Sequence, residues 1–299
     1  MQPAEAFTHP PFELGNNPLE EYTREYCASI FSGEAGQKLH ITPEASQWMT
    51  NHIVDYVARP MDAMTRDMMI GKIVHTYHVV KAIVMIAENM PHHPWDLQQV
   101  ALAGMGHDIT RFDQAYDQAT FKERADSLWR HAHKGAEMME NAPLSITPES
   151  RRAIVHAIDK HSDKTYDGEE WLAKLLRDAD KLALLAEFAQ IGDIDVKSYT
   201  DGPPSRGELP ENAYNDFFKG NLVDNGHTET YGDVMIRYLS WMNGLYFPET
   251  RRILAETNIL ERIAEKLTDY YPDDPFVQKN YPEILDQIVQ FKKEAPQAA

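Results

Sequence analysis

Apolar residues recur along most of this chain at the three- and four-residue spacing of amphipathic helices, and no stretch of useful length alternates as a half-buried strand does. The spacing predicts helices over 18–31, 42–59, 72–90, 96–111, 121–140, 147–161, 169–190, 230–246, 248–267 and 281–293. Two of them open with Thr-Pro-Glu, at 42–44 and 147–149, where the threonine suits the N-cap and the proline suits the first turn. We therefore expect an all-α fold.

The segment 191–228 interrupts this pattern with Pro203-Pro204, several glycines and many polar residues, so we predict a long loop or lid there. Residues 294–299 are expected to be a frayed tail. The chain is long enough to bury one large core. We expect a single helical domain over 1–299, with its core at about 72–182 and with the helices of 18–70 and 229–293 packed around that core.

The charge balance limits the partners of the protein. Its formal net charge is −18, from 47 acidic and 29 basic residues, which argues against a nucleic-acid polymer as the main partner. An anionic substrate would need local positive charge. Bound metal ions could supply it, together with nearby basic residues. The candidate basic residues are Arg111, Lys160, Lys164 and Lys181.

Other features of the sequence predict a cytoplasmic protein without a membrane partner. The first fifteen residues lack the basic start and apolar stretch of a secretory signal, and the apolar runs are too short to span a bilayer. The single cysteine, Cys27, cannot form an internal disulfide and excludes a cysteine-based zinc cluster.

The most apolar predicted helix leads directly into His107 and Asp108. A carboxylate at the C-terminal end of a buried helix is disfavoured by the loss of hydration and by the negative end of the helix dipole. A positive group is therefore expected beside Asp108. Arg111 is one candidate, and a divalent cation bound by the adjacent imidazole and carboxylate is another.

Helical spacing places further ionisable residues on the apolar faces of the neighbouring helices, namely His75, His131, His161 and Asp180. The same spacing puts His78 on the same side as His75, and predicts that solvent surrounds His133, His156 and Asp178. One inward histidine is usually a core residue bonded to a carbonyl group. Five helices that each direct an imidazole or a carboxylate inward instead predict a metal site, because helix bundles commonly bind metals through facing helices.

The order of these residues over about 72–182 resembles the HD-domain superfamily of metal-dependent phosphohydrolases. The matching motifs are His75-x-x-x-Val79, His107-Asp108, His131-x-x-x-Gly135-Ala136, the later His161 and Ala179-Asp180-Lys181-Leu182. The chain departs from the family in two places. Ile-Thr-Arg follows His107-Asp108, where many dinuclear members have x-Gly-Lys, and Gly104-Met105-Gly106 precedes His107, where the family has aliphatic residues. It also lacks a Gly-Tyr-Pro motif after His161, which disfavours a cyclic-di-GMP phosphodiesterase of that subtype.

The resemblance implies a dinuclear site. In its terms His75, His107, Asp108 and Asp180 bind one ion, His131 and His161 complete a second, and Asp108 bridges them. Mixed nitrogen and oxygen ligands suit iron or manganese, and also cobalt, nickel or zinc. Such a pair of ions holds a hydroxide in line with the phosphorus atom of a small phosphorylated metabolite or nucleotide. The predicted catalytic residues are Asp108, Arg111 and Lys181, and the predicted substrate-binding residues are Arg111, Lys164 and His78.

Two other functions stay open at this stage. Some HD-domain proteins use the same six ligands for a mixed-valent diiron pair that activates oxygen, and others are catalytically silent modules that bind a nucleotide. A hydrolase and an oxygenase differ in whether they consume oxygen and require iron. A homodimer is one assembly that the sequence also leaves open.

Overall fold

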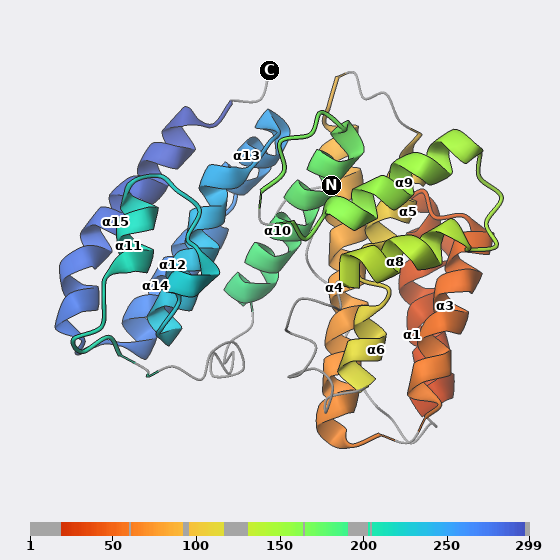
Figure 1. The fold of residues 1–299 in the computed structure, drawn as a ribbon, viewed down its shortest axis with the longest axis horizontal. Coiled ribbons are helices and arrows are strands. Elements are labelled where there is room, and N and C mark those ends of the chain that lie inside the picture. Colours follow the sequence, from red (N-terminus) through yellow and green to blue (C-terminus); the bar gives the residue numbers. More distant parts are fainter. Residues whose placement is uncertain are drawn as a thin grey trace. The chain divides into compact units, whose positions relative to one another are not determined.

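The computed structural model describes residues 19–59, 61–91, 96–116, 131–163, 165–190, 203 and 205–296, and every regular element among these residues is a helix (Figure 1). The all-α class is confirmed. The chain divides into two compact units, Met1–Asp180 and Lys181–Ala299. The N-terminal helices belong to the same unit as the predicted core, and the C-terminal helices form the second unit. The expectation that all of them make one domain stays a prediction.

The first unit contains α1 (Leu19–Phe31), α2 (Gly33–Lys38), α3 (Pro43–Val57), α4 (Ala63–Glu88), α5 (Leu97–Gly106), α6 (Arg111–Tyr116), α8 (His131–Glu140) and α9 (Pro148–Lys160). Helix α10 (Trp171–Gln190) begins in the first unit and continues into the second. The second unit also contains α11 (Asn212–Phe218), α12 (Tyr231–Ser240), α13 (Pro248–Ala255), α14 (Ile259–Tyr270) and α15 (Pro275–Glu294).

Several predicted boundaries were wrong: the predicted helix 281–293 begins at Pro275, and the predicted helix 96–111 ends at Gly106, with α6 starting separately at Arg111. Three further differences involve α4, α13 with α14, and α11. Helix α4 begins nine residues earlier than predicted, because the side chain of Asp62 caps it by accepting a hydrogen bond of 2.7 Å from the backbone N–H of Thr65. The predicted helix over 248–267 is two helices, α13 and α14, with Asn258 as the N-cap residue of the second. Helix α11 lies inside the predicted loop 191–228, of which 191–202 and 204 fall outside the described residues.

Most of helix α4 is buried in the first unit. Its segment Thr65–Glu88 is long and apolar enough to cross a bilayer, contrary to the expectation from the sequence. However, 72% of the most apolar window of this segment is buried inside the structure. Since the central helix of a bundle has the same composition, the length and hydropathy of α4 are weak evidence for a membrane span.

Two glycines explain how α5 fits between its neighbours. A Cβ atom added at Gly104 would lie 3.2 Å from the backbone Cα of Val80 on α4. A Cβ atom added at Gly106 would lie 2.5 Å from Cε of Met139 on α8 and 2.9 Å from Cδ1 of Ile158 on α9. The two glycines before His107 therefore allow α5 to approach α4, α8 and α9 closely.

We expect Gly104→Ala to lower the free energy of unfolding by about 1 to 2 kcal/mol, because the backbone of α4 must move to admit the methyl group. Gly71→Ala on α4 is the matched control, since nothing lies within 4 Å of its added Cβ. That variant should be more stable by about 0.5 to 1 kcal/mol, the helix-propensity difference between the two residues. Urea denaturation measures both. Equal gains in the two variants would contradict the close approach of α4 and α5.

Candidate metal centre

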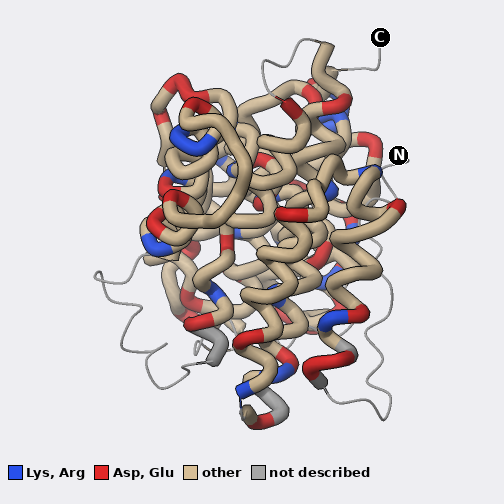
Figure 2. The backbone as a smooth tube through the Cα atoms, turned by 90° about the vertical axis from the view of Figure 1, so that its right-hand side faces the viewer, with Lys and Arg blue, Asp and Glu red and all other residues tan. Residues whose placement is uncertain are grey.

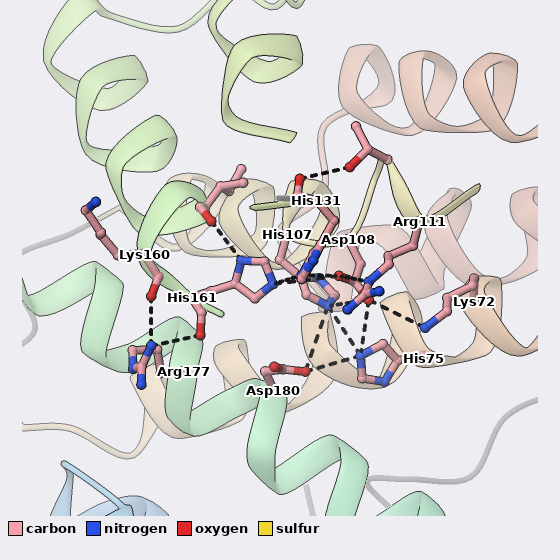
Figure 3. A network of polar contacts seen from close by, with 12 residues as sticks. Lys72, His75, His107, Asp108, Arg111, His131, Lys160, His161, Arg177 and Asp180 are labelled. Atoms are coloured by element: carbon pink, nitrogen blue, oxygen red, sulfur yellow. Dashed lines mark hydrogen bonds and ion pairs between the residues drawn. The ribbon is translucent and has the colours of Figure 1, made fainter. Parts of the chain in front are cut away.

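Six imidazole and carboxylate side chains from five helices converge in the first unit (Figure 3). Donor atoms of His75, His107 and Asp108 all lie within 4.8 Å of one another, and so do those of Asp108, His131 and His161. Asp180 joins the first of these groups, because its Oδ1 lies 3.2 Å from Nε2 of His75. Both groups could hold a metal ion.

The helix ends place three of the imidazoles. His107 and His161 are the C-cap residues of α5 and α9, and His131 is the first residue of α8. The hydroxyl of Thr110 donates a hydrogen bond of 2.9 Å to the carbonyl oxygen of His131, which ties the start of α8 to the turn after α5. This hydrogen bond helps to bring His131 close to His107 and Asp108, although they are far apart in the sequence.

Hydrogen bonds fix the tautomers of two histidines. The Nδ1–H of His107 donates to the carbonyl oxygen of Gly104, and the Nδ1–H of His161 donates to that of Ile158, each over 2.7 Å. Both rings therefore present the lone pair of Nε2 to the cluster, as a metal-binding histidine does.

The facing nitrogen atoms also fit a cation. Nε2 of His107 lies 3.3 Å from Nε2 of His75, and Nε2 of His131 lies 3.2 Å from Nε2 of His161. Two neutral imidazoles at this separation repel one another unless a proton or a cation lies between their lone pairs. The donor set thus suits a metal ion at each pair of rings.

The two carboxylate oxygens of Asp108 face different imidazole pairs. Its Oδ2 lies 4.0 Å from Nε2 of His75 and 3.8 Å from Nε2 of His107. Its Oδ1 lies 3.5 Å from Nε2 of His131 and 3.6 Å from Nε2 of His161. With Asp180, the first group offers four ligand side chains and the second offers three.

Burial favours the neutral form of two of these imidazoles. It lowers the pKa of His107 to about 4 and that of His131 to about 3. Burial alone would raise the pKa of the carboxyl groups of Asp108 and Asp180. The surrounding imidazoles outweigh burial and lower both pKa values, and Lys72 and Arg111 lower that of Asp108 further. Neutral imidazoles and ionised carboxylates are the protonation states that bind metals.

Two cationic side chains lie beside Asp108, one near each carboxylate oxygen. Nζ of Lys72 lies 3.7 Å from Oδ2, and Nε of Arg111 lies 3.4 Å from Oδ1. Their side chains are 35% and 28% exposed, so they lie between the buried carboxylate and solvent. The sequence singled out Arg111 but missed Lys72, although Lys72 lies three residues before His75 and therefore on the same face of α4.

The structure places two of the other predicted site residues. Lys181 belongs to the second unit, where its ammonium group donates to the carbonyl oxygen of Gly244 over 2.7 Å. His78 is buried on α4 with its ring 6.0 Å from that of Tyr77. Lys164 falls outside the described residues. Their catalytic or substrate-binding roles stay predictions.

The predicted solvent-facing residues divide into two kinds. His133 is 59% exposed and makes ion pairs with Asp159 and Glu137, as expected. His156 is half-buried and hydrogen-bonds to Tyr166. The prediction for Asp178 was wrong, because its side chain is fully buried, at 0% exposure. Residues 175–179 of α10 are all buried, so helical spacing does not separate a core side from a solvent side there.

Comparison of the chain with protein-family models, with curated proteins and with solved structures finds no match. The function must therefore be argued from the geometry and charge of this buried histidine and aspartate cluster, which could hold a metal ion.

Proposed function

We propose that this protein is a metal-dependent phosphohydrolase whose site holds two divalent transition-metal ions. The observation that carries the proposal is the environment of Asp108. Each of its carboxylate oxygens faces a separate pair of imidazole nitrogens, and each has one cationic side chain beside it. A bridging carboxylate between two nitrogen-rich ligand sets is typical of dinuclear hydrolytic sites.

The residues fit two ions of iron or manganese. His75, His107, Asp108 and Asp180 would hold one, and Asp108, His131 and His161 would hold the other. Imidazole with carboxylate ligation suits these metals, and cobalt, nickel or zinc, better than magnesium, which prefers oxygen ligands. When bound, such ions supply Lewis acidity, which lowers the pKa of water and neutralises charge at a phosphoryl group.

The flanking cations would bind and orient the phosphoryl group. Arg111 presents a planar guanidinium that can donate to two phosphate oxygens, and Lys72 presents a compact charge near the other carboxylate oxygen of Asp108. Both are partly exposed, so an anion can reach them. The ionised carboxylates carry no proton, so Asp108 and Asp180 would hold the ions and leave the phosphoryl group to the two cations.

The substrate is expected to be small. Acidic positions recur along the described backbone and basic ones are fewer (Figure 2). A polyanionic chain would be repelled over much of this surface, whereas one phosphorylated metabolite or nucleotide needs only the local positive charge of the site.

A panel of phosphoesters tests this function. We expect the metal-depleted protein, reloaded anaerobically with manganese, cobalt or ferrous ions, to release phosphate or a nucleotide from at least one member of the panel. Hydrolysis needs Lewis acidity but no redox change, so turnover should persist without oxygen.

The other candidate functions give different outcomes in this assay. Substrate-dependent oxygen uptake by the iron form, with no anaerobic phosphate release, would contradict the proposal in favour of an oxygenase. Binding of a nucleotide with no turnover under any metal would identify a silent module instead.

A further inference from the structure

The C-terminal end of α9 is held by a buried arginine from another helix. Nη1 of Arg177 donates to the carbonyl oxygens of Lys160 and His161, over 2.7 and 2.9 Å (Figure 3). The side chain lies on α10 and the residue is only 4% exposed. Solvent was expected around the neighbouring Asp178, and this contact of Arg177 was not predicted.

This contact fixes the backbone of a proposed metal ligand. The last carbonyl groups of a helix lack partners within the helix, and a cationic donor satisfies them. One of the two carbonyls belongs to His161 itself, whose ring is fixed separately by its bond to Ile158. Arg177 thus fixes the main chain of His161, and Ile158 fixes its ring.

Arg177 also connects the two ligand groups. It lies three residues before Asp180 on α10, so the two side chains leave the same face of that helix. Asp180 contacts His75 in the first group, while Arg177 holds His161 in the second. The spacing between these groups therefore depends in part on how firmly α10 holds the end of α9.

The second group is the more sensitive of the two. It has three ligand side chains, whereas the first has four with Asp180. Loss of the orientation of His161 leaves the second ion with only His131 and Asp108. A weakened third ligand should therefore affect the second ion far more than the first.

We propose that Arg177 is a positioning residue that sets the affinity of the second metal ion by fixing His161. The inference rests on the dinuclear site proposed above. Arg177 touches neither of the expected ions, so its effect is transmitted through the backbone of His161. Residues in the outer shell of a metal site typically change metal affinity by about 10- to 100-fold.

A second arginine cap in the same unit provides the control. Arg151 on α9 donates to the carbonyl oxygens of Met139, Glu140, Ala142 and Leu144 at the C-terminal end of α8. This is the opposite end of α8 from His131. Arg151→Gln therefore removes a similar helix cap without loosening a proposed ligand.

The experiment is a manganese titration of the metal-depleted full-length protein, with bound metal counted and with the magnetic coupling of the manganese pair followed by electron paramagnetic resonance. We expect two ions in the wild type and in Arg151→Gln, even though the latter melts at a lower temperature. We expect Arg177→Gln to keep the first ion, to bind the second at least tenfold more weakly, and to lose the coupling signal. Arg177→Lys keeps one donor group and should recover part of the affinity for the second ion. It also serves as the folded variant if Arg177→Gln does not fold.

Two failures are distinguishable. A wild-type protein that binds no manganese would remove the metal centre and this inference with it. Two ions in the wild type, bound with the same affinities and the same coupling by Arg177→Gln or by Arg177→Lys, would overturn the role of Arg177 and leave the metal centre in place. A second affinity that falls equally in Arg151→Gln would show a general effect of lost stability and would also overturn it.

Discussion

Replacement of Asp108 by alanine is expected to leave the purified protein without bound transition metal. Asp108 is the one side chain that belongs to both ligand groups, so its loss removes a ligand from each. His107→Ala should have a similar effect on the first group, because its Nε2 faces His75 and Asp108. The loss of affinity should exceed the roughly 10- to 100-fold change caused by outer-shell residues.

Metal analysis of the purified variants measures this result. His133→Ala is the matched control, because His133 lies on α8 two residues after His131 but is exposed and paired with Asp159. It should retain the metal content of the wild type. Wild-type metal content in both Asp108→Ala and His107→Ala would refute the assignment of the site.

Activity is expected to separate the inward histidines and Asp180 from the outward histidines. On the phosphoester that the panel identifies, Asp180→Asn, His131→Ala and His161→Ala should each lower turnover by at least about 100-fold, because each removes a group that would hold an ion. His133→Ala and His156→Ala should stay within a few fold of the wild type. Neither of these two side chains contributes to the ligand groups.

The comparison within each helix is the informative one. His131 and His133 share α8, and His156 and His161 share the end of α9, so general loss of stability affects both members of a pair. A larger effect from the outward member would mean that the catalytic groups lie elsewhere. Asp178→Asn is no control for Asp180→Asn, because Asp178 is fully buried and its replacement is expected to destabilise the protein.

Helical spacing in the sequence predicted much of this site because its helices are amphipathic. On α8 it separated His131 from the exposed His133, and on α4 it placed His75 in the core. The same spacing contained the information for Lys72, which occupies the face of His75 one turn earlier. That residue was missed because a lysine is usually at the surface, and only the contact with Asp108 identifies it.

The errors arise where the fold encloses a helix on every side. Arg177 and Asp178 look like a solvated pair in the sequence, yet both are buried. Lys181 follows Asp180 directly, but successive residues on a helix point about 100° apart, and its ammonium group bonds to Gly244 in the second unit. The close approach of α5 at Gly104 depends on three-dimensional packing that no local pattern contains.

The arginine caps have a consequence for the order in which the protein can form during synthesis. The carbonyl end of α8 is satisfied by Arg151, which is made later, and that of α9 is satisfied by Arg177, which is made later still. A nascent chain that has not yet reached Arg177 also lacks Asp180. The ribosome therefore releases the first half of α10 before the backbone of His161 gains its last hydrogen-bond donor, so the second ligand group reaches its final geometry late in synthesis.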